Sequence, residues 1–157
     1  MRRHGYARRG FSLLEVVIVV AIIAILAAIG IPRMSRGAKG ASDAALTGDL
    51  ATLRNAIDLY AAEHGGAFPT TTDVNTQLTQ YTNISGAVNA TKTATHIYGP
   101  YMRSIPPLPV GGKKGNSTIA DANGAGVGWI YNSSDGTIKS NTTDSEKDEA
   151  DKQYNQY

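Results

Sequence analysis

Hydrophobic and polar residues divide the first part of the chain into two helical patterns. The first is an unbroken apolar run from Val16 to Ile29, and Glu15 is the only charged residue between Phe11 and Ile31. As a helix, the segment from Phe11 to Ile31 would be about 31 Å long, near the thickness of the hydrocarbon core of a bilayer. The pattern therefore predicts a transmembrane helix over residues 11–32, with lipid or sister helices around it.

The second pattern is amphipathic and covers residues 42–64. Its apolar and aromatic positions recur at intervals of three and four, as on one face of a helix: Leu46, Leu50, Leu53, Ile57, Tyr60 and His64. Gly65-Gly66 predicts the end of this helix, and Pro32, between the two patterns, predicts a bend. The apolar stripe needs a sheet to cover it.

The remaining sequence predicts a small β-region with long loops. Residues 65–100 indicate a surface loop with a short helix near Val74–Tyr81, and the prolines of 101–110 predict a rigid extended connector packed on the long helix. Aromatic and β-branched runs on either side of an Asp-Gly turn predict a hairpin over 126–139. The acidic residues 141–157 indicate a solvated tail. Residues 33–157 would thus form one exported head.

The charge distribution indicates an orientation in the membrane. The chain carries a formal net charge of +2, with fifteen basic and thirteen acidic residues. Four of the basic residues lie in the leader, residues 1–10, which contains no acid; residues 11–157 therefore carry eleven basic and thirteen acidic groups, a formal −2. A basic flank stays in the cytoplasm, so the head is expected on the other side. The mildly acidic remainder argues against nucleic-acid binding.

The most specific signal stands just before the apolar run, in Arg8-Arg9-Gly10-Phe11-Ser12-Leu13-Leu14-Glu15. An acidic residue in the middle of a membrane costs about 2.5–3.5 kcal/mol on insertion scales, so Glu15 predicts a functional role. Cleavage between Gly10 and Phe11 would create an α-amino group that Glu15 can neutralise, in the same molecule or on a neighbour. A signal peptide cut near Ala28-Ile29-Gly30 is the main competing interpretation, although the apolar run is longer than is usual there.

This stretch resembles the cleavage-and-methylation signature of type IV pilins and type II secretion pseudopilins. The resemblance implies that a prepilin peptidase cuts after Gly10 and methylates the new N-terminus at Phe11, and that Glu15 directs assembly of subunits. It also implies an α+β pilin fold, in which a long N-terminal helix packs on a small antiparallel sheet. Two further segments are similar to the corresponding segments of the major pseudopilin: Phe68-Pro69 after the second helix, and the Pro-rich residues 101–110.

Catalytic and metal-binding residues are sparse in this sequence. The chain contains no Cys. The spacing of its three histidines, His4, His64 and His96, does not match that of a metal site. No nucleophile–base arrangement is evident, so no enzyme is expected. Resemblance to the major pseudopilins implies calcium as the one candidate ligand. The candidate carboxylates lie in the turn and the acidic tail: Asp135, Asp144 and Asp148.

The sequence therefore predicts a structural subunit that polymerises into a pseudopilus fibre in a type II secretion-like system and drives export of folded proteins. Its expected location is the bacterial inner membrane, with a single pass, a cytoplasmic N-terminus and the fibre in the periplasm. Its expected partners are further copies of itself, the prepilin peptidase, the inner-membrane assembly platform and minor pseudopilins. Two alternatives stay open: a surface type IV pilin for adhesion, motility or DNA uptake, and a membrane-anchored exported enzyme or sensor.

Overall fold

The computed structural model describes residues 11–157, without the side chains of residues 30–36. The leader peptide and Gly10 lie outside the described residues. Helix α1 (Leu13–Glu63) continues through Pro32, so this proline does not end the helix, and the bend expected there stays a prediction. Within the described part of the chain, no helix is both long enough and apolar enough to cross a membrane.

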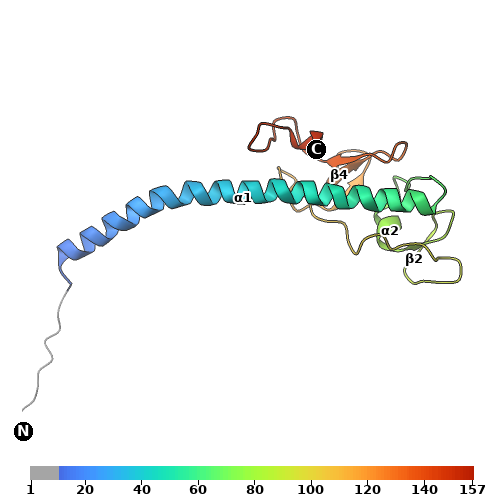
Figure 1. Ribbon diagram of the computed structural model, residues 1–157, viewed down its shortest axis with the longest axis horizontal. Helices are drawn as coiled ribbons and strands as arrows, with labels where there is room; N and C mark the ends of the chain where they lie inside the picture. Colours follow the sequence, from blue (N-terminus) through green and yellow to red (C-terminus); the bar gives the residue numbers. More distant parts are fainter. Residues whose placement is uncertain (1–10) are drawn as a thin grey trace, which may run out of the picture. The chain divides into compact units, whose positions relative to one another are not determined.

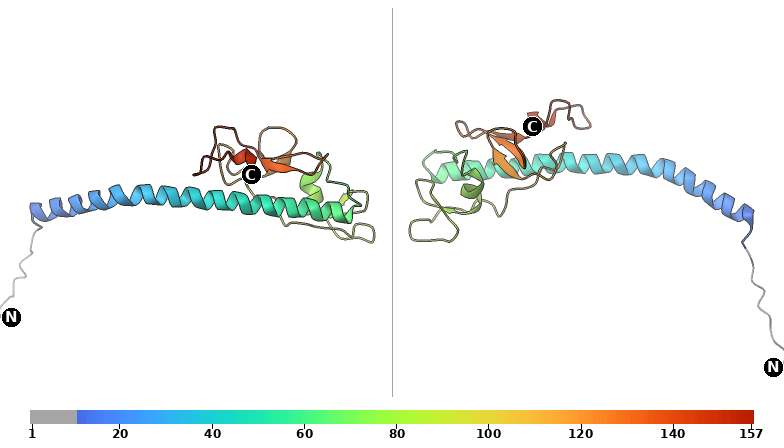
Figure 2. Two further views of the ribbon diagram at one scale, coloured as in Figure 1. Left: turned by 45° about the horizontal axis from the view of Figure 1, so that its top comes forward. Right: turned by 180° about the vertical axis from the view of Figure 1, so that it is seen from behind.

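The chain divides into two units, residues 1–38 and residues 39–157, so the head begins six residues later than the sequence predicts, and the second unit is called the head below. In the head, the remaining helices and strands are short: α2 (Val74–Thr79), β1 (Tyr81–Thr82), β2 (Val88–Asn89), β3 (Thr118–Ala120), β4 (Val127–Tyr131), β5 (Ile138–Ser140) and the 3₁₀ helix η1 (Tyr154–Gln156). The sheet of β3, β4 and β5 lies alongside the second half of α1 in each view (Figures 1 and 2). This α+β architecture confirms the expected fold class.

The predicted apolar stripe of α1 is the centre of the head's core. Leu46, Leu50, Leu53 and Ile57 are at most 1% exposed, and they form one cluster with the buried residues of the sheet. Trp129 belongs to this cluster, and its indole N–H donates to the carbonyl oxygen of Pro106 at 2.8 Å. The Pro-rich connector has no regular secondary structure, as predicted, and it satisfies the one polar atom of the buried indole.

The three-stranded sheet has the order β3-β4-β5 and is mixed rather than purely antiparallel. Strands β4 and β5 pair antiparallel, with Tyr131 opposite Ile138, which confirms the predicted hairpin. Strand β3 instead runs parallel to β4, with Ala120 beside Ile130. Parallel neighbours usually need a crossover of a dozen residues or more. Here the six residues 121–126 are enough to connect the two parallel strands. Strand β3 has only three residues, so the connection needs to run back only about 10 Å to the start of β4.

The outer edge of β3 is occupied by a side chain from α2. The amide nitrogen of Asn75 donates to the carbonyl oxygen of Ile119, and the backbone N–H of Ile119 donates to the amide oxygen of Asn75, both at 2.9 Å. These two bonds reproduce the pair that a neighbouring strand would make. Asn75 therefore takes the place of a fourth strand at this residue.

Residues 141–157 are not a solvated tail, which corrects the expectation from composition. Tyr154 is 5% exposed and belongs to the core cluster. Its hydroxyl donates to Asp43 on α1 at 2.8 Å, and its carbonyl oxygen accepts a bond from the hydroxyl of Ser140 at 2.8 Å. Asn141 is also buried and Tyr157 packs against the core cluster, so this acidic segment is part of the head.

Gly128 in β4 allows the backbone of Asn116, which follows the Pro-rich connector, to pass close to the sheet. A Cβ atom added there would lie 2.1 Å from the backbone oxygen of Asn116, with Leu108 also in contact. We expect Gly128→Ala to destabilise the head by several kcal/mol, because two backbone segments must separate. Thermal unfolding of the head checks this, with Gly48→Ala as the control, since a Cβ at Gly48 meets nothing within 4 Å. Equal melting points for the two variants would contradict the prediction.

Candidate processing and assembly segment

The predicted processing site adjoins the start of α1. Phe11 and Ser12 precede the helix, and the N–H of Val16 donates to the carbonyl oxygen of Ser12 at 3.3 Å. Glu15 is the acidic residue of the first turn. A carboxylate at this place interacts favourably with the unpaired N–H groups of the helix end. Glu15 also lies four residues after Phe11, about one helical turn away. Cleavage after Gly10 would create a free amino group on Phe11.

The apolar residues that follow have no covering surface in the described chain. Every residue from Phe11 to Ile29 is exposed, and Phe11 itself is 84% exposed. Burying apolar surface is favourable by roughly 25 cal/mol per Å². A run of this length therefore favours association with lipid or with apolar helices of other molecules.

The three calcium candidates each hold part of their own loop. Asp135 accepts bonds from the N–H and hydroxyl of Thr137, at 3.0 and 2.7 Å, and these bonds lower the pKa of Asp135. Asp144 accepts a bond from the side-chain amide of Asn155 at 2.7 Å. Asp135 lies in the β4–β5 turn and Asp144 in the acidic segment, so they belong to different loops.

Asp148 organises the acidic segment more extensively. One carboxylate oxygen accepts the N–H groups of Ala150 and Lys152, both at 2.8 Å, and the other accepts the hydroxyl of Tyr157. The bond from Tyr157 is the main reason that the pKa of Asp148 is lowered, and it raises the pKa of Tyr157 to about 12. Among the described residues, no three His, Cys, Asp or Glu side chains converge to hold a metal ion. Calcium binding stays a prediction.

The lowered pKa of Asp148 predicts a pH-dependent contribution to stability. Because the folded state favours the charged carboxylate, the contribution is present above the unfolded pKa, about 4, and is lost as the pH falls through the folded-state value. We expect wild type to melt at a higher temperature than Asp148→Asn at pH 7, and the difference to close well below pH 4. Thermal melts across this range check the prediction, and a difference that is constant with pH would contradict it.

The comparisons with known proteins point to the same N-terminal segment. The family described as the prokaryotic N-terminal methylation motif matches residues 6–31. No curated protein and no solved structure matches the chain. The matched range includes Gly10, Phe11 and Glu15 in the order that the processing chemistry needs. The motif implies processing by a prepilin peptidase and assembly into pilus-like polymers, and its family is structural rather than enzymatic. Over residues 6–31 the chain therefore carries the N-terminal methylation motif of type IV pilin-like proteins, a motif that pilins and pseudopilins share.

Proposed function

We propose that this protein is the major subunit of a pseudopilus fibre in a type II secretion-like system, with a structural and not an enzymatic role. The observation that carries the proposal is the motif at residues 6–31 followed by a run of exposed apolar side chains from Phe11 to Ile29. Such a segment can hold a precursor in a lipid bilayer and then pack among copies of itself. One helix thereby serves both as anchor and as assembly surface.

The proposed pathway begins with a precursor in the bacterial inner membrane. The arginine-rich leader faces the cytoplasm, residues 11–32 span the bilayer, and the head lies in the periplasm. The prepilin peptidase cuts after Gly10 and methylates Phe11. An assembly platform and minor pseudopilins then start the fibre, into which copies of this chain are added. The second candidate within the family is a surface type IV pilin, which shares this processing.

The mature N-terminus tests the proposal directly. Intact mass and N-terminal sequencing of protein purified from membranes should show a chain that begins at Phe11 and carries one added methyl group. Replacing Gly10 by a bulkier residue should leave the full precursor in the membrane. A mature start near Ile29 would instead indicate a secretory signal peptide, and the pilin-like assignment would fail.

A second experiment separates the two fibre types. In the native host, loss of a pseudopilin stops release of secreted proteins into the medium, whereas loss of a surface pilin removes external fibres and leaves secretion intact. We expect deletion of this gene to abolish secretion. Normal secretion combined with missing surface fibres would favour the type IV pilin.

A further inference from the structure

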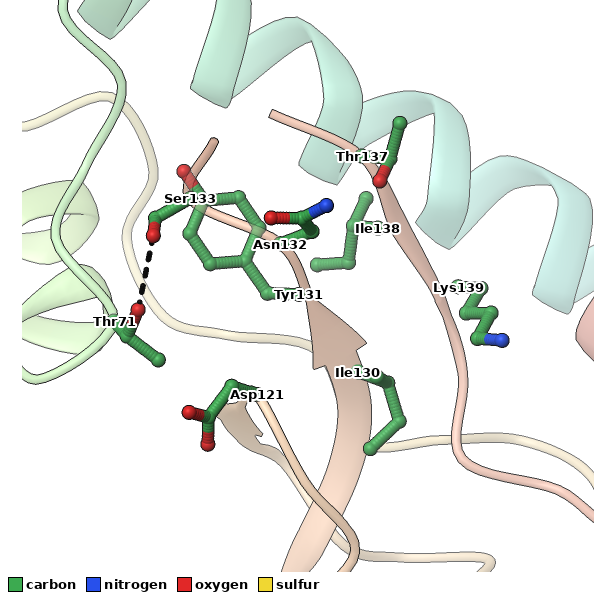
Figure 3. A pocket seen from close by; sticks show the side chains of 9 residues that line it. All are labelled: Thr71, Asp121, Ile130, Tyr131, Asn132, Ser133, Thr137, Ile138 and Lys139. Atoms are coloured by element: carbon green, nitrogen blue, oxygen red, sulfur yellow. Dashed lines mark hydrogen bonds between the residues drawn. The ribbon is translucent and has the colours of Figure 1, made fainter. Parts of the chain in front are cut away.

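A hollow of about 540 Å³ lies over the outer face of the β4–β5 hairpin. Ile130 lies near its middle, Asp121 and Lys139 lie on either side of Ile130, and the hydrogen-bonded pair Thr71 and Ser133 marks one end (Figure 3). The strand register accounts for the place of Lys139, because Ala120, Ile130 and Lys139 form one row across the three strands, and Asp121 directly follows Ala120 at the end of β3. We call this feature the hairpin hollow.

Two opposite charges in the hairpin hollow are free to meet a partner. Within residues 11–157 as described, the side chains of Asp121 and Lys139 have neither a hydrogen bond nor an ion pair. Both residues are exposed. Charges of opposite sign across an apolar floor favour a protein segment that carries the complementary pair, and they disfavour a ligand of a single charge sign.

A segment of this same chain carries such a pair. In the acidic loop (residues 143–153), an antiparallel β-bridge pairs Lys147 with Gln153. The carboxylate of Asp148 accepts hydrogen bonds from two backbone N–H groups of the same loop. Lys147 and Glu149 are exposed, opposite in charge, and without side-chain partners among the described residues. The loop is therefore ordered before any contact forms, which lowers the entropic cost of binding.

The backbone at the tip of the acidic loop also indicates a constrained surface. Asp151 has a φ of 63°, and among the described residues it is the one non-glycine residue with positive φ. Its N–H donates to the carbonyl oxygen of Asp148 at 3.4 Å. Asp adopts this left-handed conformation in turns more readily than most residues, and here it fixes the path of the backbone at the tip of the loop.

The hairpin hollow and the acidic loop are separate surfaces of the head, because Ile138 and Lys139 of β5 line the hollow and the acidic loop begins only after β5 has ended. This strand begins just after the hairpin turn and leads directly into the acidic loop. In Figure 1 the turn (orange-red) and the acidic loop (dark red) extend in opposite directions from β4. A contact between the loop of one head and the hollow of another is therefore heterologous, and it can repeat from copy to copy without closing.

We propose that the acidic loop of one subunit docks into the hairpin hollow of the next, with Lys147 against Asp121 and Glu149 against Lys139. This inference rests on the proposed fibre, and it assigns a contact between heads rather than between the N-terminal helices. The ion pairs are exposed, so their role is to set the register of neighbouring heads, while the apolar segment drives association.

Site-specific cross-linking in full-length assembled fibres tests the contact, and the absence of native Cys makes the result unambiguous. The double variant Asp121→Cys with Lys147→Cys, treated with a short bis-maleimide, should give a ladder of dimers, trimers and larger species. A ladder is expected because each subunit offers both halves of a heterologous contact. Lys92→Cys with Lys147→Cys is the matched control and should give no ladder.

Charge reversal provides a second measurement. Asp121→Lys should reduce the yield of fibres by about two- to fivefold, the upper part of the range expected when one exposed ion pair is lost. Adding Lys147→Asp to it should restore the yield, whereas adding Lys92→Asp should not. Fibres of normal yield in Asp121→Lys, or fibres that give no ladder or only dimers with the Cys pair, would overturn this contact and leave the proposed function intact. Failure of correctly processed wild-type protein to form any fibre would overturn both.

Discussion

Glu15→Ala should abolish fibres while leaving the subunit inserted, cleaved at Phe11 and folded. Glu15 is the only charge between Phe11 and Ile31, and it lies in the first turn of α1. In the proposed fibre its carboxylate neutralises the new amino group of Phe11 on an adjacent subunit. Without it, each added subunit would place an unpaired ammonium in an apolar environment, which costs several kcal/mol even after relaxation.

The competing explanation assigns Glu15 only to the end of its own helix. A first-turn carboxylate contributes about 0.3–1 kcal/mol to a helix, too little to decide assembly. Electron microscopy of sheared fibres, with intact mass of the membrane-bound subunit, separates the two cases. Glu15→Asp is the control because it keeps the charge, and it should retain more fibres than Glu15→Ala. Normal fibres from Glu15→Ala would show that the carboxylate serves its own helix.

Leu53→Ala should lower the melting temperature of the head by about 10 °C or more. The side chain is fully buried in the core cluster, and truncation of a buried leucine costs about 2–5 kcal/mol. For small domains each kcal/mol shifts the melting point by roughly 4–8 °C. A truncated head beginning at Lys39 is the right material, because all the core residues lie within that unit.

Leu59→Ala is the matched control on the same helix. Leu59 is 51% exposed, so its truncation should change the melting temperature by little. Equal losses in the two variants would contradict the assignment of the buried stripe. If the truncated head shows no cooperative melt at all, the head does not fold independently of the N-terminal segment.

The parts of the fold that sequence predicts well are those with a strong local pattern. The stripe of Leu46, Leu50, Leu53 and Ile57 has the helical period, and all four are buried. The β4–β5 hairpin follows from aromatic and β-branched runs on either side of an Asp-Gly turn. In both cases the local preference of the chain agrees with its packing, so single-sequence reasoning succeeds.

The parts that sequence does not predict depend on a few residues or on pairing between distant segments. Strand β3 has three residues, too short for a period to show, so its parallel pairing could not be anticipated. Composition predicts a solvated tail for the acidic segment because it averages over many charges, whereas the packing of the segment depends on a few residues, above all Tyr154. The hairpin hollow arises only in the folded head, where the strand register sets Lys139 beside Ile130 and Asp121, just after β3, lies on the other side of Ile130.

The amide of Asn75 has a consequence for how this protein can polymerise. An uncovered sheet edge is a template for further strands, and a protein held at high local concentration in a fibre would be exposed to that hazard constantly. The side chain of Asn75 hydrogen-bonds both the backbone N–H and the carbonyl oxygen of Ile119, the two groups that a further strand would need on the outer edge of β3. Strand-by-strand growth toward amyloid is thereby blocked at the middle of this edge. In the proposed fibre, ordered growth through helices and loops would use other surfaces, so this one side chain would help to separate productive polymerisation from aggregation.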